Sequence, residues 1–525
     1  MKKTVVGLTG QSGAGKTTIS DAFRENGFEI INCDLVAREV TNADSECCKE
    51  LAKLFPSCFD ENYSLDRQKL GEIVFSDKNK LQMLNDTIYP FINKLIDKKI
   101  NATESEFVLL DAPTLFEAGA DKLCSVIVSV VADFGIRLER ITKRDGISAE
   151  LAKKRFSSQH TMEFFKAHSS DEWYMFTFNF EGIAGEAGLY RDDGWNFWDW
   201  AGVKVVNVVV DHPLYYNKYI RKHPEKYIQL DIDEMHVAYM NRFFPEVHTE
   251  YMLTAGTELN YNRCIMPDKN YLSMKERPID IIFTGNYTPK RILRKHLDNM
   301  DDEYIDFYEG VLSYLIDNPS ETIDAAAENA LCREFPDITD EQLVDCMPNM
   351  MYADLAVRFH YRELAIRALA DSGLKIHTYG EGYNYIECNH HENIIEHGGV
   401  DSKVCLDMIS QAKISLNVMP WFKMGAHDRV FNTMLNGGVA LTDTSLFYEN
   451  TFADGENVLF YSLEDLRDYE KSGYDECIAS RITDKVKCAL ADTKHLQEIA
   501  DSGYECCKGR HSWIERAVVI EKYFG

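Results

Sequence analysis

One short segment near the amino terminus constrains the fold more than any other feature. Residues 10–17, Gly-Gln-Ser-Gly-Ala-Gly-Lys-Thr, match the pattern G-x-x-x-x-G-K-[ST] at every fixed position. The segment follows a strand-like run, Val5 to Leu8, and precedes a helical pattern, which is the context that a phosphate-binding loop requires. Glycines there let backbone N–H groups converge on phosphates at a helix amino terminus. The sequence therefore predicts a nucleotide-binding α/β domain, with a glycine-rich turn that binds no nucleotide as the alternative.

The loop also predicts which residues hold the nucleotide. Lys16 is expected to contact the β- and γ-phosphates, and the Thr17 hydroxyl is expected to ligate Mg²⁺. ATP and Mg²⁺ are thus the expected cofactors. The residues expected to bind ATP are Gly10, Ser12, Gly13, Ala14, Gly15, Lys16, Thr17, Thr18 and Arg144.

Two carboxylates are placed to act next to this loop. Asp34 follows the second predicted strand, residues 28–32, at the strand end where open α/β sheets bind ligands. A carboxylate there can orient and deprotonate an attacking hydroxyl, although Asp34 could equally be a helix N-cap. Asp111 ends the run 107–110 and is placed like a carboxylate that attends the metal.

Seven basic residues cluster between positions 137 and 155. The chemical interpretation is an arginine-bearing lid that closes over the transferred phosphate, and the alternative is a solvated helical face. These residues are Arg137, Arg140, Lys143, Arg144, Lys153, Lys154 and Arg155.

The first 160 residues resemble the dephospho-CoA kinases. The matching segments are 10–17, 32–38 (Asn-Cys-Asp-Leu-Val-Ala-Arg), 66–75, 111–117 (Asp-Ala-Pro-Thr-Leu-Phe-Glu), 140–145 and 155–159. The resemblance implies that Asp34 is the base for a ribose 3′-hydroxyl and that Arg140 contacts ATP phosphates. It also implies a helical CoA domain around residues 66–75. The chain departs from the family at Tyr89 (usually His) and Arg137 (usually Gln), and it lacks the family's last strand and helix after residue 169.

The second half contains a separate α/β series. Strand-and-glycine segments occur at 280–286 and 375–380, and a longer unit covers 415–443. In that unit Arg429 opens a helix and Gly437-Gly438 follows it, an arrangement that can hold a diphosphate. The alternative is an ordinary buried α/β unit with a salt-bridged Arg429.

Residues 280–524 resemble the donor-binding domain of group 1 glycosyltransferases related to the spore-maturation glycosyltransferase-like proteins. Residues 173–275 resemble the later part of their acceptor domain, whose opening strands are missing here. The resemblance implies a GT-B architecture, a nucleotide-sugar donor and no obligatory metal. Asn432 stands where a donor-binding glutamate is common. The residues implied to bind the donor are Gly285, Asn286, His427, Arg429, Asn432, Gly437 and Gly438.

Charge separates the two halves. Residues 1–160 carry 22 Lys+Arg and 24 Asp+Glu, whereas the remainder carries 35 and 61 of a chain whose net charge is −28. The acidic second half argues against nucleic-acid binding. We therefore expect an α/β chain with three domains: a P-loop kinase at 1–169, a partial acceptor-side domain at 170–278 and a nucleotide-sugar-binding domain at 279–525.

The sequence also bears on location. No apolar run approaches the roughly 20 residues that span a bilayer, and the amino terminus lacks the pattern of a signal peptide. The 14 cysteines are interpreted as free thiols, so the cytoplasm is the expected location.

The leading hypothesis is phosphorylation of dephospho-CoA by MgATP, with an appended glycosyltransferase-like module and small molecules as the only partners. A glycosyltransferase with a remnant kinase domain is the alternative. A non-catalytic nucleotide-binding scaffold is the third hypothesis.

Overall fold

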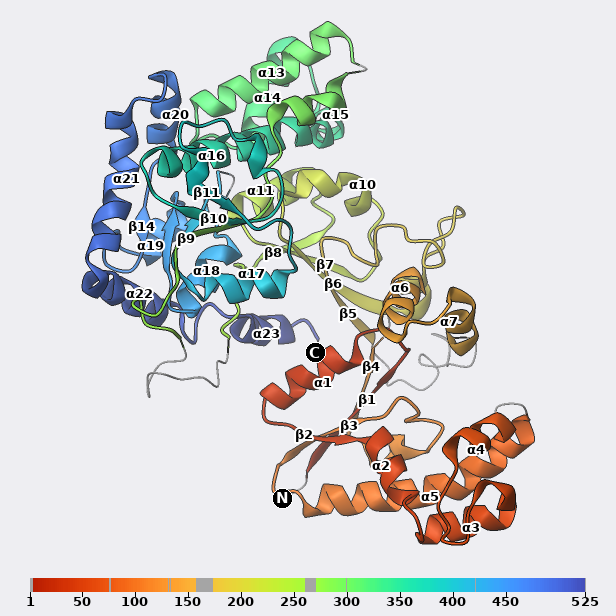
Figure 1. The fold of residues 1–525 in the computed structure, drawn as a ribbon. Helices are drawn as coiled ribbons and strands as arrows, with labels where there is room; N and C mark the ends of the chain where they lie inside the picture. The colour runs from red at the N-terminus through yellow and green to blue at the C-terminus, as the bar shows by residue number, and fades with distance from the viewer. Residues whose placement is uncertain are drawn as a thin grey trace. The chain divides into compact units, whose positions relative to one another are not determined.

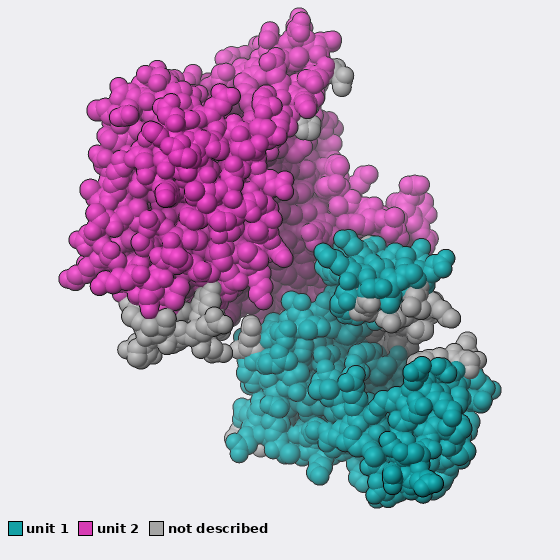
Figure 2. All heavy atoms as spheres, viewed as in Figure 1, with its two compact units in different colours: residues 1–172 teal, residues 173–525 magenta. Residues whose placement is uncertain are grey.

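The computed structural model describes residues 3–74, 77–130, 132, 134–156, 173–259, 271–298, 300–420 and 422–524. The chain divides into two compact units, residues 1–172 and residues 173–525 (Figure 2). Both are built on parallel β-sheets covered by helices, which is the predicted α/β class.

The first unit contains a four-stranded sheet in which every pairing is parallel. Its strands are β1 (Thr4–Gly10), β2 (Glu29–Asn32), β3 (Phe107–Asp111) and β4 (Val126–Val130). The order is β2-β3-β1-β4, so β1 lies between β3 and β4 (Figure 1). All four strands were predicted, because parallel strands covered on both faces are continuous apolar runs.

Helices cover both faces of this sheet. α1 (Lys16–Glu25) packs on one face through Ile19 and Phe23. α5 (Lys78–Ala102) packs on the other face through Ile92 and Ile96.

The other helices of this unit are α2 (Cys33–Val40), α3 (Glu46–Leu54), α4 (Arg67–Val74), α6 (Phe134–Asp145) and α7 (Ala149–Phe156). α3 and α4 share an apolar core with α5, which forms the helical domain that the resemblance implied. α6 and α7 pack against each other through Ile141, Ala152 and Phe156.

The second unit begins with a four-stranded parallel sheet in the order β5-β6-β7-β8. Its strands are β5 (Trp173–Phe178), β6 (Val203–Val209), β7 (Tyr227–Asp231) and β8 (His248–Tyr251). In the described part of the chain no strand pairs with the outer edge of β5. This sheet is the incomplete first Rossmann-like domain that the sequence predicted.

A six-stranded parallel sheet follows. Its strands are β9 (Ile279–Thr284), β10 (Ile376–Tyr379), β11 (Ile394–Glu396), β12 (Ala412–Asn417), β13 (Val439–Thr442) and β14 (Leu459–Phe460). The order β11-β10-β9-β12-β13-β14 is 3-2-1-4-5-6 in chain order, the order of the doubly wound Rossmann fold. The winding reverses between β9 and β12, and ligands of such sheets bind at the carboxyl ends of the strands there.

Helices surround the two sheets of the second unit (Figure 1). They are α9 (Phe197–Ala201), α10 (Asn217–Ile220), α11 (Glu234–Phe243), α12 (Lys290–Leu293), α13 (Asp302–Asp317), α14 (Ile323–Glu334), α15 (Asp340–Cys346), α16 (Met351–Asp371), α17 (Ser402–Ile409), α18 (Asp428–Leu435), α19 (Leu446–Thr451), α20 (Leu463–Lys471), α21 (Glu476–Ala491), α22 (Thr493–Cys507) and α23 (Trp513–Glu521). The predicted helical block at 300–372 contains α13 to α16. α23 packs beside the end of the β5–β8 sheet, where Arg516 Nε donates to Leu253 O, just after β8, at 2.7 Å.

Three strands were not predicted: β8, β11 and β14. β11 and β14 have only three and two residues, and the four residues of β8, His-Thr-Glu-Tyr, contain no apolar run. Among the described residues, no helix is both long enough and apolar enough to cross a membrane.

Candidate functional site

The predicted phosphate-binding loop joins β1 to α1. Gly10 has φ of 129°, and a Cβ added there would lie 2.0 Å from Val130 O, so no side chain fits. Gly13 has φ of 80° and packs against α6, where an added Cβ would lie 3.0 Å from Arg137 O. Helix α1 begins at Lys16, so its unpaired N–H groups and positive end lie at the loop.

The Lys16 ammonium is held by the loop itself. Nζ donates to Gly10 O at 2.9 Å and to Gln11 O at 3.3 Å. Burial lowers the pKa of Lys16, and the charges of Asp111 and Asp34 act in the opposite direction. The structure therefore brings both predicted carboxylates close to the phosphate-binding lysine.

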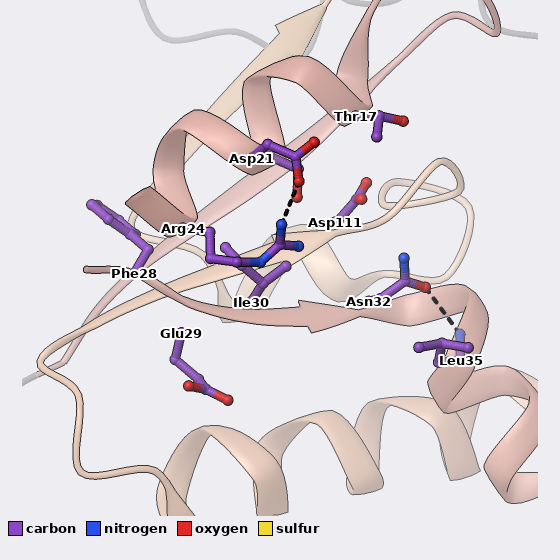
Figure 3. Close-up of a pocket in the computed structure, with 10 residues that line it drawn as sticks. Thr17, Asp21, Arg24, Phe28, Glu29, Ile30, Asn32, Leu35 and Asp111 are labelled. Atoms are coloured by element: carbon purple, nitrogen blue, oxygen red, sulfur yellow. Dashed lines mark hydrogen bonds and ion pairs between the residues drawn. The ribbon is translucent and has the colours of Figure 1, made fainter. Parts of the chain in front are cut away.

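A cavity of about 420 Å³ lies beside the loop (Figure 3). Its walls come from α1, β2, the start of α2 and the end of β3. The lining residues are Thr17, Ser20, Asp21, Arg24, Phe28, Glu29, Ile30, Asn32, Leu35 and Asp111.

Thr17 and Asp111 offer oxygen atoms to this cavity. Burial raises the pKa of Asp111, the Lys16 charge opposes that shift, and the Asp34 charge adds to it. A buried carboxylate of this kind favours a cation, and carboxylate and hydroxyl oxygens suit Mg²⁺. The described residues contain no cluster of three His, Cys, Asp or Glu that would hold a metal alone. The two side chains therefore fit a Mg²⁺ that shares its coordination with phosphates.

Asp34 lies in the first turn of α2 with its side chain exposed. Asn32 is the N-cap of this helix, because its Oδ1 accepts from Leu35 N at 3.0 Å. The alternative that Asp34 itself is the N-cap is therefore wrong. Its carboxylate stands at the end of β2, on the same edge of the sheet as Asp111.

Helix α6 brings arginines onto the outside of the loop. Arg140 Nη1 donates to Gly13 O at 3.4 Å, and Arg137 is buried against the loop. After burial and the two carboxylates, the charges of Arg137 and Arg144 act on Lys16 and lower its pKa. The alternative interpretation, a solvated helical face, is therefore wrong for Arg137. Parts of the predicted lid lie outside the described residues: the side chains of Lys154 and Arg155, and Gln159.

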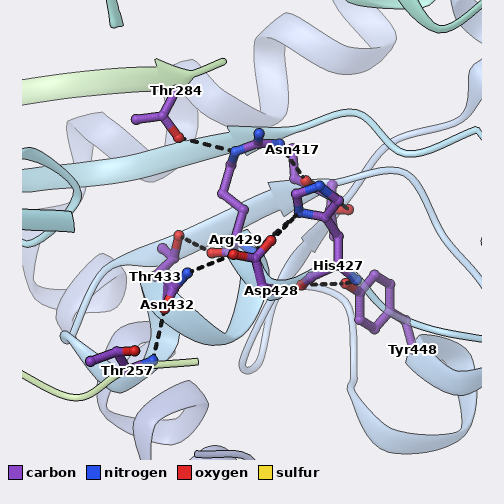
Figure 4. A network of polar contacts seen from close by, with 10 residues as sticks. Thr257, Thr284, Asn417, His427, Asp428, Arg429, Asn432, Thr433 and Tyr448 are labelled. Atoms are coloured by element: carbon purple, nitrogen blue, oxygen red, sulfur yellow. Dashed lines mark hydrogen bonds and ion pairs between the residues drawn. The ribbon is translucent and has the colours of Figure 1, made fainter. Parts of the chain in front are cut away.

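The second site lies where the winding of the six-stranded sheet reverses. Arg429, in the first turn of α18, reaches back to the ends of two strands (Figure 4). Its Nε donates to Thr284 Oγ1 at 3.1 Å, and its Nη1 donates to Asn417 Oδ1 at 2.8 Å. Gly285 follows β9, and an added Cβ would lie 3.4 Å from Arg429 Nη2.

The alternative interpretation, in which Arg429 forms a salt bridge, is wrong. Arg429 bonds to a hydroxyl and an amide, whereas Asp428 pairs with His427, Nδ1 to Oδ1, at 3.0 Å. His427 is the N-cap residue of α18.

Four of the predicted donor-binding residues lie together: Gly285, Asn286, His427 and Arg429. Asn286 follows Gly285, and its Oδ1 accepts from Glu381 N at 3.0 Å.

The two glycines predicted to bind the donor do not join this group, whereas Asn432 is linked to it, because its Nδ2 donates to Asp428 Oδ2 at 3.1 Å and Asp428 pairs with His427. Asn432 Oδ1 accepts from Thr257 N at 2.8 Å on another side of α18 (Figure 4). Gly437 and Gly438 lie beyond the carboxyl end of α18. A Cβ added at Gly437 would lie 2.1 Å from the Tyr271 ring, so this glycine serves close packing.

Arg362 is a site residue that the sequence analysis missed. It lies on α16, is 8% exposed, and donates from Nη1 to Asn286 O. The Arg362 and Arg429 guanidinium groups lie 5.0 Å and 4.9 Å from the centroid of the Phe283 ring. Burial lowers the pKa of both arginines. No periodic pattern marks Arg362, because Arg358 lies one turn before it on the same face of α16.

The parallel order β2-β3-β1-β4, the loop and its lysine define the first unit as a P-loop nucleotide-binding domain. Residues 4–173 match the family described as dephospho-CoA kinase, and residues 362–522 match one described as glycosyl transferase-like. The dephospho-CoA kinase of Fusobacterium nucleatum subsp. nucleatum is 36% identical over 167 residues, 31% of this chain and 84% of that protein. That of Bacillus licheniformis is 32% identical over 164 residues, 30% of this chain and 81% of that protein.

The chain therefore belongs, through its first unit, to the dephospho-CoA kinase family, whose members use ATP as a substrate. A glycosyl transferase-like domain is fused to it. Among solved structures, sucrose-phosphate synthase from Thermosynechococcus elongatus is similar at 10% identity, with a TM-score of 0.33, over 75% of this chain and 80% of that chain.

Proposed function

We propose that the first unit transfers the γ-phosphoryl group of MgATP to the 3′-hydroxyl of dephospho-CoA. The observation that supports this most is the meeting of Asp34, Asp111 and Lys16 at the mouth of the P-loop, where the two carboxylates act on one ammonium. A nucleotide-binding loop alone needs no such second carboxylate. The curated relatives of this unit are named dephospho-CoA kinases.

The residues divide the reaction between them. Asp34 takes the proton of the acceptor hydroxyl while the hydroxyl oxygen forms a bond to the γ-phosphorus. The bond between the γ-phosphorus and the β–γ bridging oxygen breaks. ADP leaves with that bridging oxygen. Lys16 and the loop N–H groups stabilise the charge that spreads over the transferred group. Arg140 is proposed to do the same after its guanidinium exchanges Gly13 O for a phosphate oxygen.

Thr17 and Asp111 are proposed to hold Mg²⁺, which neutralises phosphate charge when bound. The other loop residues proposed to bind ATP are Gly10, Ser12, Gly13, Ala14, Gly15 and Thr18, with Arg144 from α6. The proposed domains are 1–169, 170–278 and 279–525. ATP and a coenzyme precursor as substrates point to the cytoplasm as the location.

The test is ADP release by the full-length protein with MgATP, with and without dephospho-CoA. Asp34→Asn should lower the release that depends on dephospho-CoA by about a hundredfold or more, the usual contribution of a general base, while ATP still binds. Asp97→Asn makes the same chemical change at an exposed position of α5 and should leave the rate unchanged. An Asp34→Asn protein with full activity would refute the assignment of the base.

A second candidate function is glycosyl transfer from a nucleotide sugar by the second unit. It is favoured by Arg362 and Arg429, two buried cations that form no ion pair with a carboxylate among the described residues. An uncompensated buried charge is costly, so such a pair favours an anionic ligand. The position at the reversal of the sheet, with Gly285 facing both guanidinium groups, suits a diphosphate.

Titration calorimetry with UDP, GDP and ADP tests this candidate. One of the three should bind, and Arg429→Met should weaken its binding by about tenfold or more, the effect of one charge-assisted hydrogen bond. Arg333→Met, an exposed change on α14, is the matched control. Because ADP also fits the P-loop, its titration is repeated with Lys16→Ala. If no nucleoside diphosphate binds the second unit, the candidate fails.

A further inference from the structure

Arg137 lies in the first turn of α6, a helix of the predicted lid, and it is only 5% exposed. Its guanidinium is directed at the outer side of the P-loop. Nε donates to Ser12 O at 3.0 Å, and Nη1 donates to Gln11 Oε1 at 2.9 Å. One side chain therefore bonds two consecutive residues of the loop.

The bond to Ser12 O affects the neighbouring N–H group as well. The carbonyl of Ser12 and the N–H of Gly13 belong to one planar trans peptide unit, and they point in opposite directions. When Arg137 holds this carbonyl toward α6, the Gly13 N–H is directed away from α6. In a phosphate-binding loop the N–H groups must converge on the ligand.

Close packing adds to this control. A Cβ added at Gly13 would lie 3.2 Å from Arg137 Cα, so the backbones of the loop and α6 are in direct contact. Arg140, one turn further along α6, donates to Gly13 O at 3.4 Å. Helix α6 thus contacts Ser12 and Gly13 on the outer side of the loop.

Helix α7 fixes the Arg137 side chain in turn. The guanidinium carbon lies 4.1 Å from the centroid of the Phe156 ring, which is the distance of a cation–π contact. The Phe134 and Phe156 rings form a T-shaped pair whose centroids are 5.5 Å apart. Arg137 is held in one orientation, and its two hydrogen bonds to the loop cost little further entropy.

We propose that Arg137 is a positioning residue for ATP. It fixes residues 11–13 of the P-loop from the side opposite the phosphates, without touching the nucleotide. This inference rests on the proposed kinase function of the first unit. It assigns ATP affinity in part to the α6–α7 hairpin, and it predicts that the acceptor site is not affected.

The test compares Arg137→Met, Arg137→Lys and the control Lys98→Met, an exposed change on α5, all in the full chain. ATP affinity is measured by titration calorimetry and the KM of each substrate by ADP release. Arg137→Met keeps an unbranched side chain but loses both donors and the cation–π contact with Phe156, and should weaken ATP binding by about tenfold. Its KM for ATP should rise in parallel, while the KM for dephospho-CoA stays within about twofold.

Arg137→Lys should recover part of the affinity, because an ammonium can reach one of the two acceptors but cannot match both. Lys98→Met should bind ATP like the wild type. ATP affinity of Arg137→Met within twofold of the wild type would overturn the inference, as would an equal rise in KM for both substrates. If Arg137→Met unfolds at a much lower temperature than the wild type, the test rests on Arg137→Lys. An ATP affinity of Arg137→Lys equal to that of the wild type would then overturn the inference.

These outcomes are distinct from failure of the proposed function. A wild-type protein that binds ATP but does not phosphorylate dephospho-CoA would refute the kinase assignment, whereas the comparison of ATP affinities would still decide the role of Arg137. A wild-type protein that binds no ATP would overturn both.

Discussion

At the scale of single residues, three charged groups govern the first unit: Lys16, Asp34 and Asp111. Burial shifts the pKa of Lys16 downward and that of Asp111 upward, and the charge of each group opposes the shift of the other. The exposed Asp34 carboxylate acts on both. The pKa values of Lys16 and Asp111 should therefore respond to ATP and to Mg²⁺.

The pH dependence of the kinase should show this coupling. A carboxyl group with a raised pKa gains its proton at a higher pH than an ordinary aspartate, so the acidic fall in activity should begin above about pH 4. Mg²⁺ favours the ionised form of Asp111, so more Mg²⁺ should move this limb to lower pH. A pH–rate profile at two Mg²⁺ concentrations measures it. A limb that stays in place as Mg²⁺ increases would contradict the role of Asp111.

The sequence predicted these three residues because the loop motif and the strand ends place them on one edge of a sheet. It did not predict the contacts of Arg137 with the loop or the position of Arg362 beside Arg429. Those contacts join residues that are more than 60 positions apart and depend on how helices pack, which local patterns do not specify. The Gly437-Gly438 pair was also placed in a site from which it lies apart, because Gly437 packs on Tyr271, a residue from a distant part of the chain.

At the scale of elements, the unit formed by β1, the loop and α1 depends on one backbone conformation. Gly10 adopts φ of 129° directly against β4, so it terminates β1 and starts the loop without room for a side chain. Long buried strands such as β1, β6 and β9 were predictable from their apolar runs. Short edge strands such as β11 and β14 were not, because their pairing with neighbours, rather than their composition, makes them strands.

Gly10→Ala should therefore destabilise the first unit more than an equivalent change elsewhere. The new Cβ meets Val130 O and requires backbone movement, which should lower the free energy of unfolding by about 3 kcal/mol or more. Gly27→Ala is the control, because Gly27 also has positive φ (83°) but nothing lies within 4 Å of the added Cβ, and its cost should be about 1–2 kcal/mol. Urea denaturation measures both. Equal losses in the two variants would contradict the steric account.

At the scale of the whole molecule, two compact units with separate cores share one chain. The first unit has one parallel sheet and the second has two, each unit has its own predicted ligand, and the excess of acidic residues lies in the second half. We expect calorimetry to resolve two unfolding transitions, one for each unit.

Asp443 allows the two transitions to be assigned. This residue follows β13 and is buried, and burial raises its pKa to about 7, against about 4 in an unfolded chain. The folded protein therefore retains a proton that the unfolded chain loses, and the free energy of unfolding falls as the pH rises from about 4 to 7. Asp443→Asn removes this loss, so it should raise one transition temperature at pH 8 more than at pH 5. A shift in both transitions would contradict independent unfolding.

The most direct test of the central claim is ADP release by the purified full-length protein with MgATP, in the presence and absence of dephospho-CoA. The account predicts release that requires dephospho-CoA, is lost in Asp34→Asn and persists in Asp97→Asn. A folded protein that binds ATP but releases no ADP with dephospho-CoA would contradict it.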